Sequence, residues 1–469
     1  MRRISRSITQ VSILALLALL LVALSLQAVV PVGAQDATAT PNDPIWRAFS
    51  AVRSAIEEDR SVDLTIIKSY DWEQSEWKTG IDDCTKAATD DPASARKVYF
   101  GWTFTITSLR GEIFQGRVSF DLKAVTVCDQ VVSATPVPGG TPDPNLPTPI
   151  PGGAVAGGFE LGGQALDMNL NTFGLMARAG MKWVKQQVRY NQGDDASKAQ
   201  GQINTAHANG YKVLLSILGN RDQLSSNFDG FVGSFAGFVG GIAGLGADAV
   251  EIWNEPNIDR EWPAGQINGG SYTKMLAAAY NAVKSKNPNT IVISGAPAPT
   301  GFFGAAGCTS NGCNDDTFMS QMAQAGAAQY LDCVGLHYNE GIVSPSTGSG
   351  DPRGEYPTRY FGSMLSRGYS PFGGKPVCFT ELGYLSPDGY PTPLPANFAW
   401  GQNTSSAEQA SWLAEAATLA AQSGKVRMMV VFNVDYSFYT ADDPQGGYAI
   451  YRPGGSCPAC DALGAVMKK

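Results

Sequence analysis

Histidine is nearly absent from this 469-residue sequence, which contains only His207 and His337. A zinc site made of three histidines and a His-Glu-x-x-His helix therefore cannot form. The sequence also lacks the Gly-x-x-x-x-Gly-Lys-Ser/Thr loop that binds nucleotides and the Gly-x-Ser-x-Gly turn that carries a nucleophilic serine. We accordingly expect no metal and no nucleotide cofactor.

Charged residues are also sparse, at 16%, while hydrophobic residues make up 43% of the chain, as in an ordinary globular protein. The formal net charge is −8. Such an acidic chain suits neither nucleic acid nor an anionic membrane surface. We therefore expect no nucleic-acid partner, and a neutral substrate fits better.

The first 34 residues have the pattern of a secretory signal. Arg2, Arg3 and Arg6 precede an apolar run from Ile13 to Leu24, and Val32-Gly33-Ala34 resembles a cleavage site of small residues. We expect residues 1–34 to be a signal peptide and the mature protein to be secreted or at the cell surface. If the apolar run is not cleaved, it would instead attach the chain to the cell envelope through its N-terminal segment.

An exported chain with eight cysteines is expected to contain disulfides. Their positions along the sequence favour three pairs: Cys84 with Cys128, Cys308 with Cys313, and Cys457 with Cys460. Cys333 and Cys378 fall inside apolar strand-like runs, where buried thiols are common, and the sequence leaves their pairing state open.

Two domains and a linker are predicted from the order of patterns. Residues 43–132 begin with helical spacing of apolar residues and continue with four strand-like runs, which indicates a small α+β domain without a recognisable chemical motif. Residues 133–153 contain seven prolines among threonine, glycine and serine, a composition typical of an extended linker. Residues 154–469 form the third segment.

In residues 154–469, strand-like and helix-like runs alternate. A capping box from Ser405 to Glu408 marks the start of one helix. This order predicts an α/β fold, a (β/α)8 TIM barrel, preceded by the small α+β domain and the Pro-rich linker. A doubly wound dinucleotide-binding sheet is disfavoured because no Gly-x-Gly-x-x-Gly follows the first strand. The eight predicted strands are 158–163, 182–189, 212–218, 249–254, 291–295, 333–338, 377–380 and 428–434.

Two glutamates lie at the ends of predicted strands. Glu255 follows the apolar-rich run that begins at Asp248, where Pro256 ends the strand, and Glu381 lies near the end of the run from Pro376 to Tyr384. Active sites of such barrels lie at the carboxyl ends of the strands, so the two side chains are expected to face one mouth. Two carboxylates across one cleft suit glycoside hydrolysis.

The residues around these glutamates carry a resemblance. Trp253-Asn254-Glu255-Pro256-Asn257 and Thr380-Glu381-Leu382-Gly383-Tyr384 resemble the two signatures of the (β/α)8 glycoside hydrolase clan that includes the cellulase-like family 5 and the xylosidase-like family 39. The resemblance covers about residues 155 to 465. It implies a retaining enzyme with Glu255 as acid/base, Glu381 as nucleophile and Asn254 as a contact to the sugar 2-hydroxyl.

These roles set electrostatic requirements. Glu255 would need a raised pKa, and Glu381 a cationic or hydroxyl neighbour. Tyr338 falls where the clan often has an aromatic hydroxyl, and Lys185 falls where it has a strand-two arginine, with Arg189 four residues further on. His337 either lines the mouth or is a hydrogen-bonded strand residue without a chemical role.

Carbohydrate sites use aromatic rings as platforms, and five aromatic residues fall in or near the expected top-face loops. We expect them to contact substrate, although each is equally able to pack within its loop: Trp262, Tyr384, Trp400, Phe432 and Tyr436. Strand eight lacks the tryptophan that the clan often has there.

Two other functions remain open, a catalytically inactive carbohydrate-binding protein and a transglycosylase that remodels cell-surface glycan.

Overall fold

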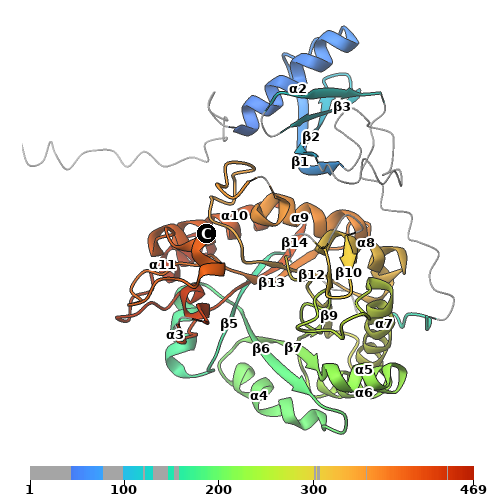
Figure 1. The fold of residues 1–469 in the computed structure, drawn as a ribbon, viewed down its shortest axis with the longest axis vertical. Coiled ribbons are helices and arrows are strands. Elements are labelled where there is room, and N and C mark those ends of the chain that lie inside the picture. Colours follow the sequence, from blue (N-terminus) through green and yellow to red (C-terminus); the bar gives the residue numbers. More distant parts are fainter. Residues whose placement is uncertain are drawn as a thin grey trace, which may run out of the picture. The chain divides into compact units, whose positions relative to one another are not determined.

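The computed structural model describes two folded regions, an N-terminal helix-and-sheet unit and a barrel (Figure 1). The predicted signal peptide, residues 1–34, and most of the predicted linker lie outside the described residues. No helix within the described part of the chain is both long and apolar enough to cross a membrane. The described residues are 44–77, 99–119, 122–129, 146–152, 158–299, 303, 307–354, 356–440 and 442–468.

The N-terminal unit contains a helix followed by strands, in the order that the sequence pattern predicts. One helix accompanies an antiparallel sheet with the strand order β1-β2-β3-β4. Phe49 of the helix lies 5.8 Å, between ring centres, from Phe104 of the second strand, and a Cβ on Gly116 would lie 2.7 Å from Val52. The helix therefore packs closely on the sheet at a glycine. The elements are α2 (Pro44–Arg60), β1 (Ile67–Trp77), β2 (Tyr99–Ser108), β3 (Ile113–Ser119) and β4 (Val125–Cys128).

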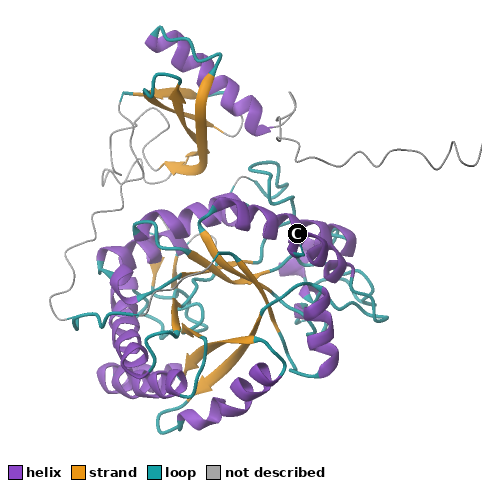
Figure 2. Cartoon of the chain, turned by 180° about the vertical axis from the view of Figure 1, so that it is seen from behind, coloured by secondary structure: helices purple, strands orange, loops and turns teal. Residues whose placement is uncertain are grey.

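Eight parallel strands form the barrel, surrounded by helices (Figure 2). The sheet closes because Ile293 bridges to Cys333, just before β12, and Ser294 N donates to Cys333 O at 3.2 Å. The predicted (β/α)8 fold is confirmed. Its strands are β5 (Glu160–Gln164), β6 (Trp183–Tyr190), β7 (Lys212–Gly219), β8 (Ala249–Ile252), β9 (Ile291–Ser294), β12 (Val334–Tyr338), β13 (Val377–Leu382) and β14 (Val426–Val431).

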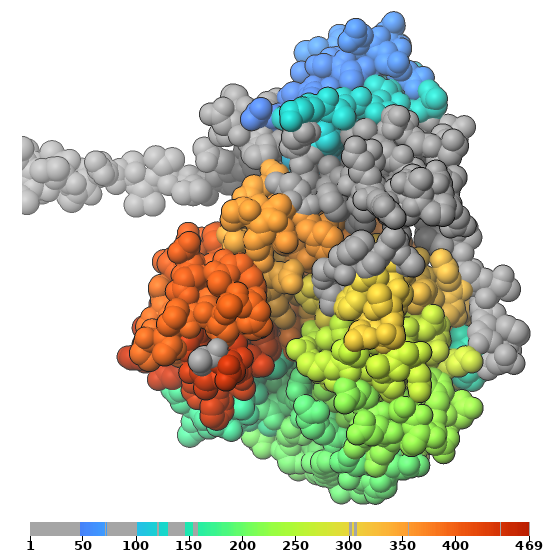
Figure 3. Space-filling view, in the orientation of Figure 1, coloured from blue at the N-terminus to red at the C-terminus, as the bar shows by residue number. Residues whose placement is uncertain are grey.

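The helices follow the strands in sequence and cover the outside of the barrel. The capping box predicted at Ser405 and Glu408 is present at the start of α10. The last helix packs beside the first one of the barrel, where Arg178 and Asp461 form an ion pair, and Figure 3 shows these red and green ends of the barrel region together. The helices are α3 (Leu170–Arg178), α4 (Gln200–Ala208), α5 (Arg221–Ser226), α6 (Phe228–Gly244), α7 (Gly269–Lys286), α8 (Asp315–Gln324), α9 (Phe361–Tyr369), α10 (Ser406–Ser423) and α11 (Pro458–Met467).

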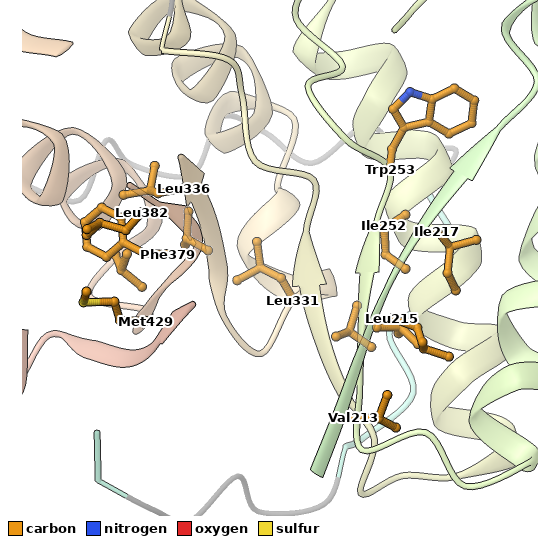
Figure 4. Packing of buried hydrophobic residues seen from close by; sticks show 14 of the residues in the cluster. Val213, Leu215, Ile217, Ile252, Trp253, Leu331, Leu336, Phe379, Leu382 and Met429 are labelled. Atoms are coloured by element: carbon orange, nitrogen blue, oxygen red, sulfur yellow. The ribbon is translucent and has the colours of Figure 1, made fainter. Parts of the chain in front are cut away.

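Side chains alternate between two hydrophobic layers along each barrel strand. On β7, Val213, Leu215 and Ile217 belong to the layer between strands and helices (Figure 4), whereas Leu214 belongs to the cluster inside the barrel. This alternation follows from the two-residue period of a strand. An inward-facing residue near a strand's carboxyl end therefore points toward the mouth.

Two predicted cysteine pairs are confirmed, and a pairing that the sequence left open is resolved. Cys308–Cys313 and Cys457–Cys460 are disulfides, and Cys84 of the other predicted pair lies outside the described residues. Cys333 and Cys378 are fully buried and form a disulfide with a Cα–Cα distance of 5.8 Å. They come from neighbouring strand regions, β12 and β13, and both face the barrel interior.

The end of the predicted linker contacts the barrel. Asn281 on α7 accepts a hydrogen bond from Ile150 N and donates one to Thr148 O, at 2.8 and 2.9 Å. Tyr330 donates to Pro147 O at 2.6 Å. Residues 146–152 therefore lie against the barrel and are held there by these hydrogen bonds.

Candidate active site

Glu255 lies three residues beyond the end of β8, in a backbone with unusual torsions. The φ angles of Trp253 and Glu255 are +75° and +45°, in the left-handed region that non-glycine residues rarely adopt. Each such residue costs about 1–3 kcal/mol, and such strain concentrates at functional sites. Hydrogen bonds from Trp253 N to Ile217 O and from Glu255 N to Ala296 O, both 3.0 Å, hold this turn against the adjacent strands.

A disulfide-closed hairpin supports the loop that follows Glu255. The hairpin consists of β10 (Cys308–Thr309) and β11 (Gly312–Cys313). Asn257 is fully buried; its Nδ2 donates to Ala298 O and Cys313 O at 3.0 and 3.1 Å, while its Oδ1 accepts from Ala298 N at 2.8 Å. With every polar atom of its amide paired, Asn257 ties the Glu255 loop to two neighbouring segments.

Glu381 lies within β13, and its carboxylate faces the barrel interior. Lys185 Nζ on β6 lies 3.1 Å from Glu381 Oε1, and Asn339 Nδ2, directly after β12, lies 3.2 Å from Oε2. Only 8% of the Glu381 side chain is exposed. Each carboxylate oxygen thus has its own donor, and Lys185 supplies the predicted cationic neighbour.

A second buried carboxyl side chain accompanies Lys185. Glu251 on β8 is fully buried; its Oε2 lies 3.5 Å from Lys185 Nζ and its Oε1 accepts from Thr380 Oγ1 at 2.7 Å. Burial works against the charge on Lys185, but Glu381 and Glu251 outweigh burial and raise the pKa of the ammonium. Lys185 therefore stays charged in the centre of the barrel, between two carboxyl groups.

His337 connects the two predicted catalytic residues. Its Nδ1 lies 3.1 Å from Glu255 Oε1 and 3.8 Å from Glu381 Oε2, and the ring is fully buried. Burial disfavours the charged ring, but the Glu381 and Glu255 carboxylates outweigh it and raise the pKa of His337. Of the two alternatives that the sequence left open for His337, the structure thus supports a place at the mouth of the barrel.

The electrostatics of Glu255 differ from the sequence expectation. Burial favours its neutral form, but His337 and Arg260 outweigh burial and lower the pKa of Glu255. Arg260 Nη2 lies 2.5 Å from Glu255 Oε2. The expected raised pKa is therefore wrong, since His337 contacts one carboxylate oxygen and Arg260 the other.

Asn254 and Arg189 take positions at the mouth. Asn254 is 7% exposed, and its Oδ1 has no hydrogen-bond partner among the described residues. Arg189, near the end of β6, is exposed and acts on Glu261 by charge alone. Glu381 therefore takes its cationic contact from Lys185 and not from Arg189.

Three predicted contact residues point away from the site. Tyr338 donates its hydroxyl to Arg359 O at 3.0 Å, Tyr384 packs edge-on against Tyr338, and Trp262 packs against Trp253. All three are fully buried in the layer between strands and helices. The expectation that they contact substrate is corrected, because adjacent strand residues face opposite sides and His337 takes the inward position that Tyr338 cannot share.

The other three aromatic residues keep partly exposed rings. Phe432 packs at 5.4 Å on Tyr448, whose hydroxyl donates to the backbone carbonyl of Asn339, the Glu381 partner. Trp400 carries the Arg353 guanidinium 4.7 Å above its ring. Tyr436 is half-buried beside the end of β14.

Sequence reasoning missed four residues of the site: Arg260, Asn339, Glu251 and Tyr448. Glu251 had a usable signal, because it is a charged residue in the middle of a strand whose other residues are apolar. Asn339 also had a signal, because it immediately follows strand six. Arg260 had no signal in the sequence, because an arginine in a polar loop resembles ordinary surface charge.

No family model matches the sequence, and no curated protein matches it. Solved structures of glycoside hydrolases are similar in fold. An endo-1,4-β-mannanase from Rhizomucor miehei is 14% identical, with 68% of this chain and 98% of that chain covered and a TM-score of 0.44. The catalytic domain of an endoglucanase from Thermobifida fusca is 13% identical, with 66% and 92% covered and a TM-score of 0.37.

Proposed function

We propose that this protein is a retaining β-glycoside hydrolase that cleaves β-linked oligo- or polysaccharide, with Glu255 as acid/base and Glu381 as nucleophile. One observation carries the proposal: both carboxylates contact the same atom, His337 Nδ1, at 3.1 and 3.8 Å. Their nearest oxygens are thus at most about 7 Å apart, a limit compatible with the roughly 5 Å spacing of retaining enzymes.

The chemistry proceeds in two displacements. Glu381 attacks the anomeric carbon while the glycosidic C–O bond breaks and Glu255 gives its proton to the departing oxygen. Water then attacks the same carbon while the Glu255 carboxylate takes its proton, which breaks the bond to Glu381. Because the carbon is inverted twice, the product keeps the β configuration.

The surroundings of the glutamates fit this assignment. Lys185 and Asn339 hold both oxygens of Glu381, so the nucleophile is oriented and its charge is balanced. Asn254 Oδ1 and Asn339 Oδ1 are buried polar atoms without a partner in the described part of the chain. Sugar hydroxyls can satisfy both, and an Asn254 contact to the 2-hydroxyl agrees with the clan resemblance.

Export is part of the proposal. The pattern of residues 1–34 supports a signal peptide, and three disulfides among the described residues suit an oxidising compartment. We therefore place the enzyme outside the cytoplasm, secreted or at the cell surface.

The decisive experiment combines a substrate screen with a nucleophile variant. Residues 35–469 are tested on a panel of β-linked glycans and aryl β-glycosides, and E381G is tested on whichever is cleaved. Loss of the nucleophile should lower kcat/KM by at least about a thousandfold, and added azide should restore cleavage with an α-glycosyl azide as product. Sugar binding without turnover on the whole panel would indicate a binding protein instead, and E381G with unchanged turnover would refute the assignment.

A further inference from the structure

Arg260 contacts the carboxylate oxygen of Glu255 that His337 does not contact. Glu255 Oε1 contacts His337, whose ring is fully buried, whereas Oε2 contacts Arg260, whose side chain is 70% exposed. Oε2 is therefore the oxygen whose partner is exposed. A glycosidic oxygen must come within about 2.6–3.2 Å of the protonated carboxyl oxygen to receive its proton.

Arg260 disfavours a proton on Oε2. A guanidinium offers only donors, so it pairs more strongly with a charged carboxylate oxygen than with the hydroxyl oxygen of a protonated carboxyl group. The contact of 2.5 Å between Nη2 and Oε2 thus favours the base form of Glu255. The acid form is favoured when the arginine is elsewhere.

The loop allows the side chain of Arg260 to move while its backbone stays in place. The preceding residue, Asp259, donates its N–H to Asn311 O at 3.0 Å, and the following residue, Glu261, accepts at its carbonyl from the Trp253 indole at 3.0 Å. Arg260 Nε also lies 3.6 Å from Glu261 Oε1, a second anion within reach. The motion required is a side-chain rotation between two carboxyl groups.

We propose that Arg260 is a positioning residue that assigns Glu255 to its two successive roles. It leaves Oε2 when the leaving-group sugar binds, which permits the acid step, and it returns after that sugar departs, which stabilises the carboxylate for the base step. This inference rests on the proposed glycosidase function. Burial raises the pKa of Glu255, whereas His337 and then Arg260 lower it, so the departure of Arg260 removes the smaller of the two lowering contributions.

The proposed mechanism itself changes one charge near Glu255, because Glu381 loses its negative charge when it forms the bond to the sugar. His337 faces Oε1 from β12, Glu381 faces His337 from β13, and Lys185 lies beside Glu381 from β6. Glu261 adds a carboxyl group beside Arg260, and burial, followed by the Glu255 charge, raises the pKa of Glu261, on which Arg189 of β6 also acts by charge. Among these described groups, His337, Glu381 and Lys185 are buried, Glu261 is partly exposed, and Arg260 and Arg189 are exposed.

The experiment compares R260Q with R221Q and with the wild type. Arg221 is a matched control, because its exposed guanidinium donates only to backbone carbonyls of the same loop, Asp259 O and Arg260 O, and forms no hydrogen bond or ion pair with Glu255 in the described part of the chain. Two aryl β-glycosides of one sugar are used, one with a poor phenol leaving group, which needs the acid step, and one with a dinitrophenol leaving group, which does not. The pH dependence of kcat/KM and the pre-steady-state burst are measured.

In R260Q the alkaline limb of kcat/KM for the poor leaving group should move upward by about half a unit or more, because Glu255 keeps its proton to higher pH. With the dinitrophenyl substrate, kcat should fall several-fold and glycosyl-enzyme should accumulate, because the base step loses its cation. R221Q should show neither change. An unmoved alkaline limb, or an equal loss on both substrates, would overturn the proposal while leaving the glycosidase assignment intact; a wild type without any hydrolysis would overturn both.

Discussion

The two glutamates of the site are held in different ways. Glu381 lies on a strand, and its cationic partner, Lys185, is a fully buried residue of another strand. Glu255 lies beyond its strand in a left-handed backbone, and one of its two cationic partners, Arg260, is mostly exposed. The barrel interior thus fixes the proposed nucleophile, whereas a loop holds the proposed acid/base, the group that would have to change its protonation state.

Among the variants that distinguish Glu255 from Glu381, E255Q has the largest expected effect on the rate of hydrolysis. Loss of the acid should slow cleavage of unactivated glycosides by about 10²–10⁴-fold, whereas the first step on dinitrophenyl glycosides should be nearly unchanged, because that leaving group needs no proton. Rates on both substrate types, with and without azide, check this, and the azide product should be the β-anomer. K212M, whose ion pair to Glu160 lies away from both glutamates, should preserve the wild-type dependence on leaving group; equal losses on both substrates in E255Q would argue against an acid/base role.

A second prediction concerns Lys185, the buried partner of Glu381. K185M removes the cation between Glu381 and Glu251 and should destabilise the fold by about 3–5 kcal/mol, because buried carboxyl groups lose their partner. Activity should fall as well, because Glu381 loses the donor at Oε1. Thermal unfolding and kcat/KM are measured together.

Two controls sharpen the K185M test. In K185M/E251Q the second carboxyl charge is gone, so the melting temperature should partly recover while activity stays low. K212M removes an exposed ion pair to Glu160 at 2.8 Å and should cost no more than about 1 kcal/mol. If K185M were as mild as K212M, the buried cluster would not have the role assigned to it.

The smallest expected effect is on the pH dependence of stability through His337. Its raised pKa contributes stability fully below about pH 6.5, the ordinary histidine value, and this contribution is lost as the pH rises through the folded-state pKa. The lowered pKa of Glu255 contributes stability above about pH 4.3, and this is lost as the pH falls through its folded-state value. The pair should therefore stabilise the fold most between about pH 4.5 and 6.5.

Melting temperatures of wild type and H337Q from pH 4 to 9 check this expectation. The wild type should exceed H337Q in the acidic window by a few degrees, on the order of 2–4 °C, and the gap should narrow toward pH 9. A gap that widened as the pH rose would show that the neutral ring, and not the charged one, is the stabilising form.

The fold could be predicted because its signals are local. Strand-like runs, helix caps such as Ser405 with Glu408, and the proline that ends the Glu255 run all act within a few residues. The two glutamates followed from their places at strand ends. The direction in which a side chain points at a strand end could not be predicted. An error of one residue in the strand end exchanges an inward-facing position for an outward-facing one, as for His337 and Tyr338.

Contacts between distant segments could not be predicted. The Cys333–Cys378 disulfide depends on two strands 45 residues apart becoming neighbours in the closed barrel. The Glu251–Lys185 contact likewise depends on which inward positions share a level of the barrel. Arg260 reaches Glu255 only because a disulfide-closed hairpin supports its loop, and no short sequence pattern encodes that arrangement.

The most direct test of the account is covalent trapping of the nucleophile. A 2-deoxy-2-fluoro dinitrophenyl β-glycoside of the sugar that the enzyme accepts is incubated with the wild type, and the labelled peptide is identified by mass spectrometry. The account predicts one sugar per chain, attached to Glu381, and no label in E381G. Attachment to Glu255 or to a residue outside the β13 peptide, or turnover of ordinary substrate by an enzyme that cannot be labelled, would contradict it.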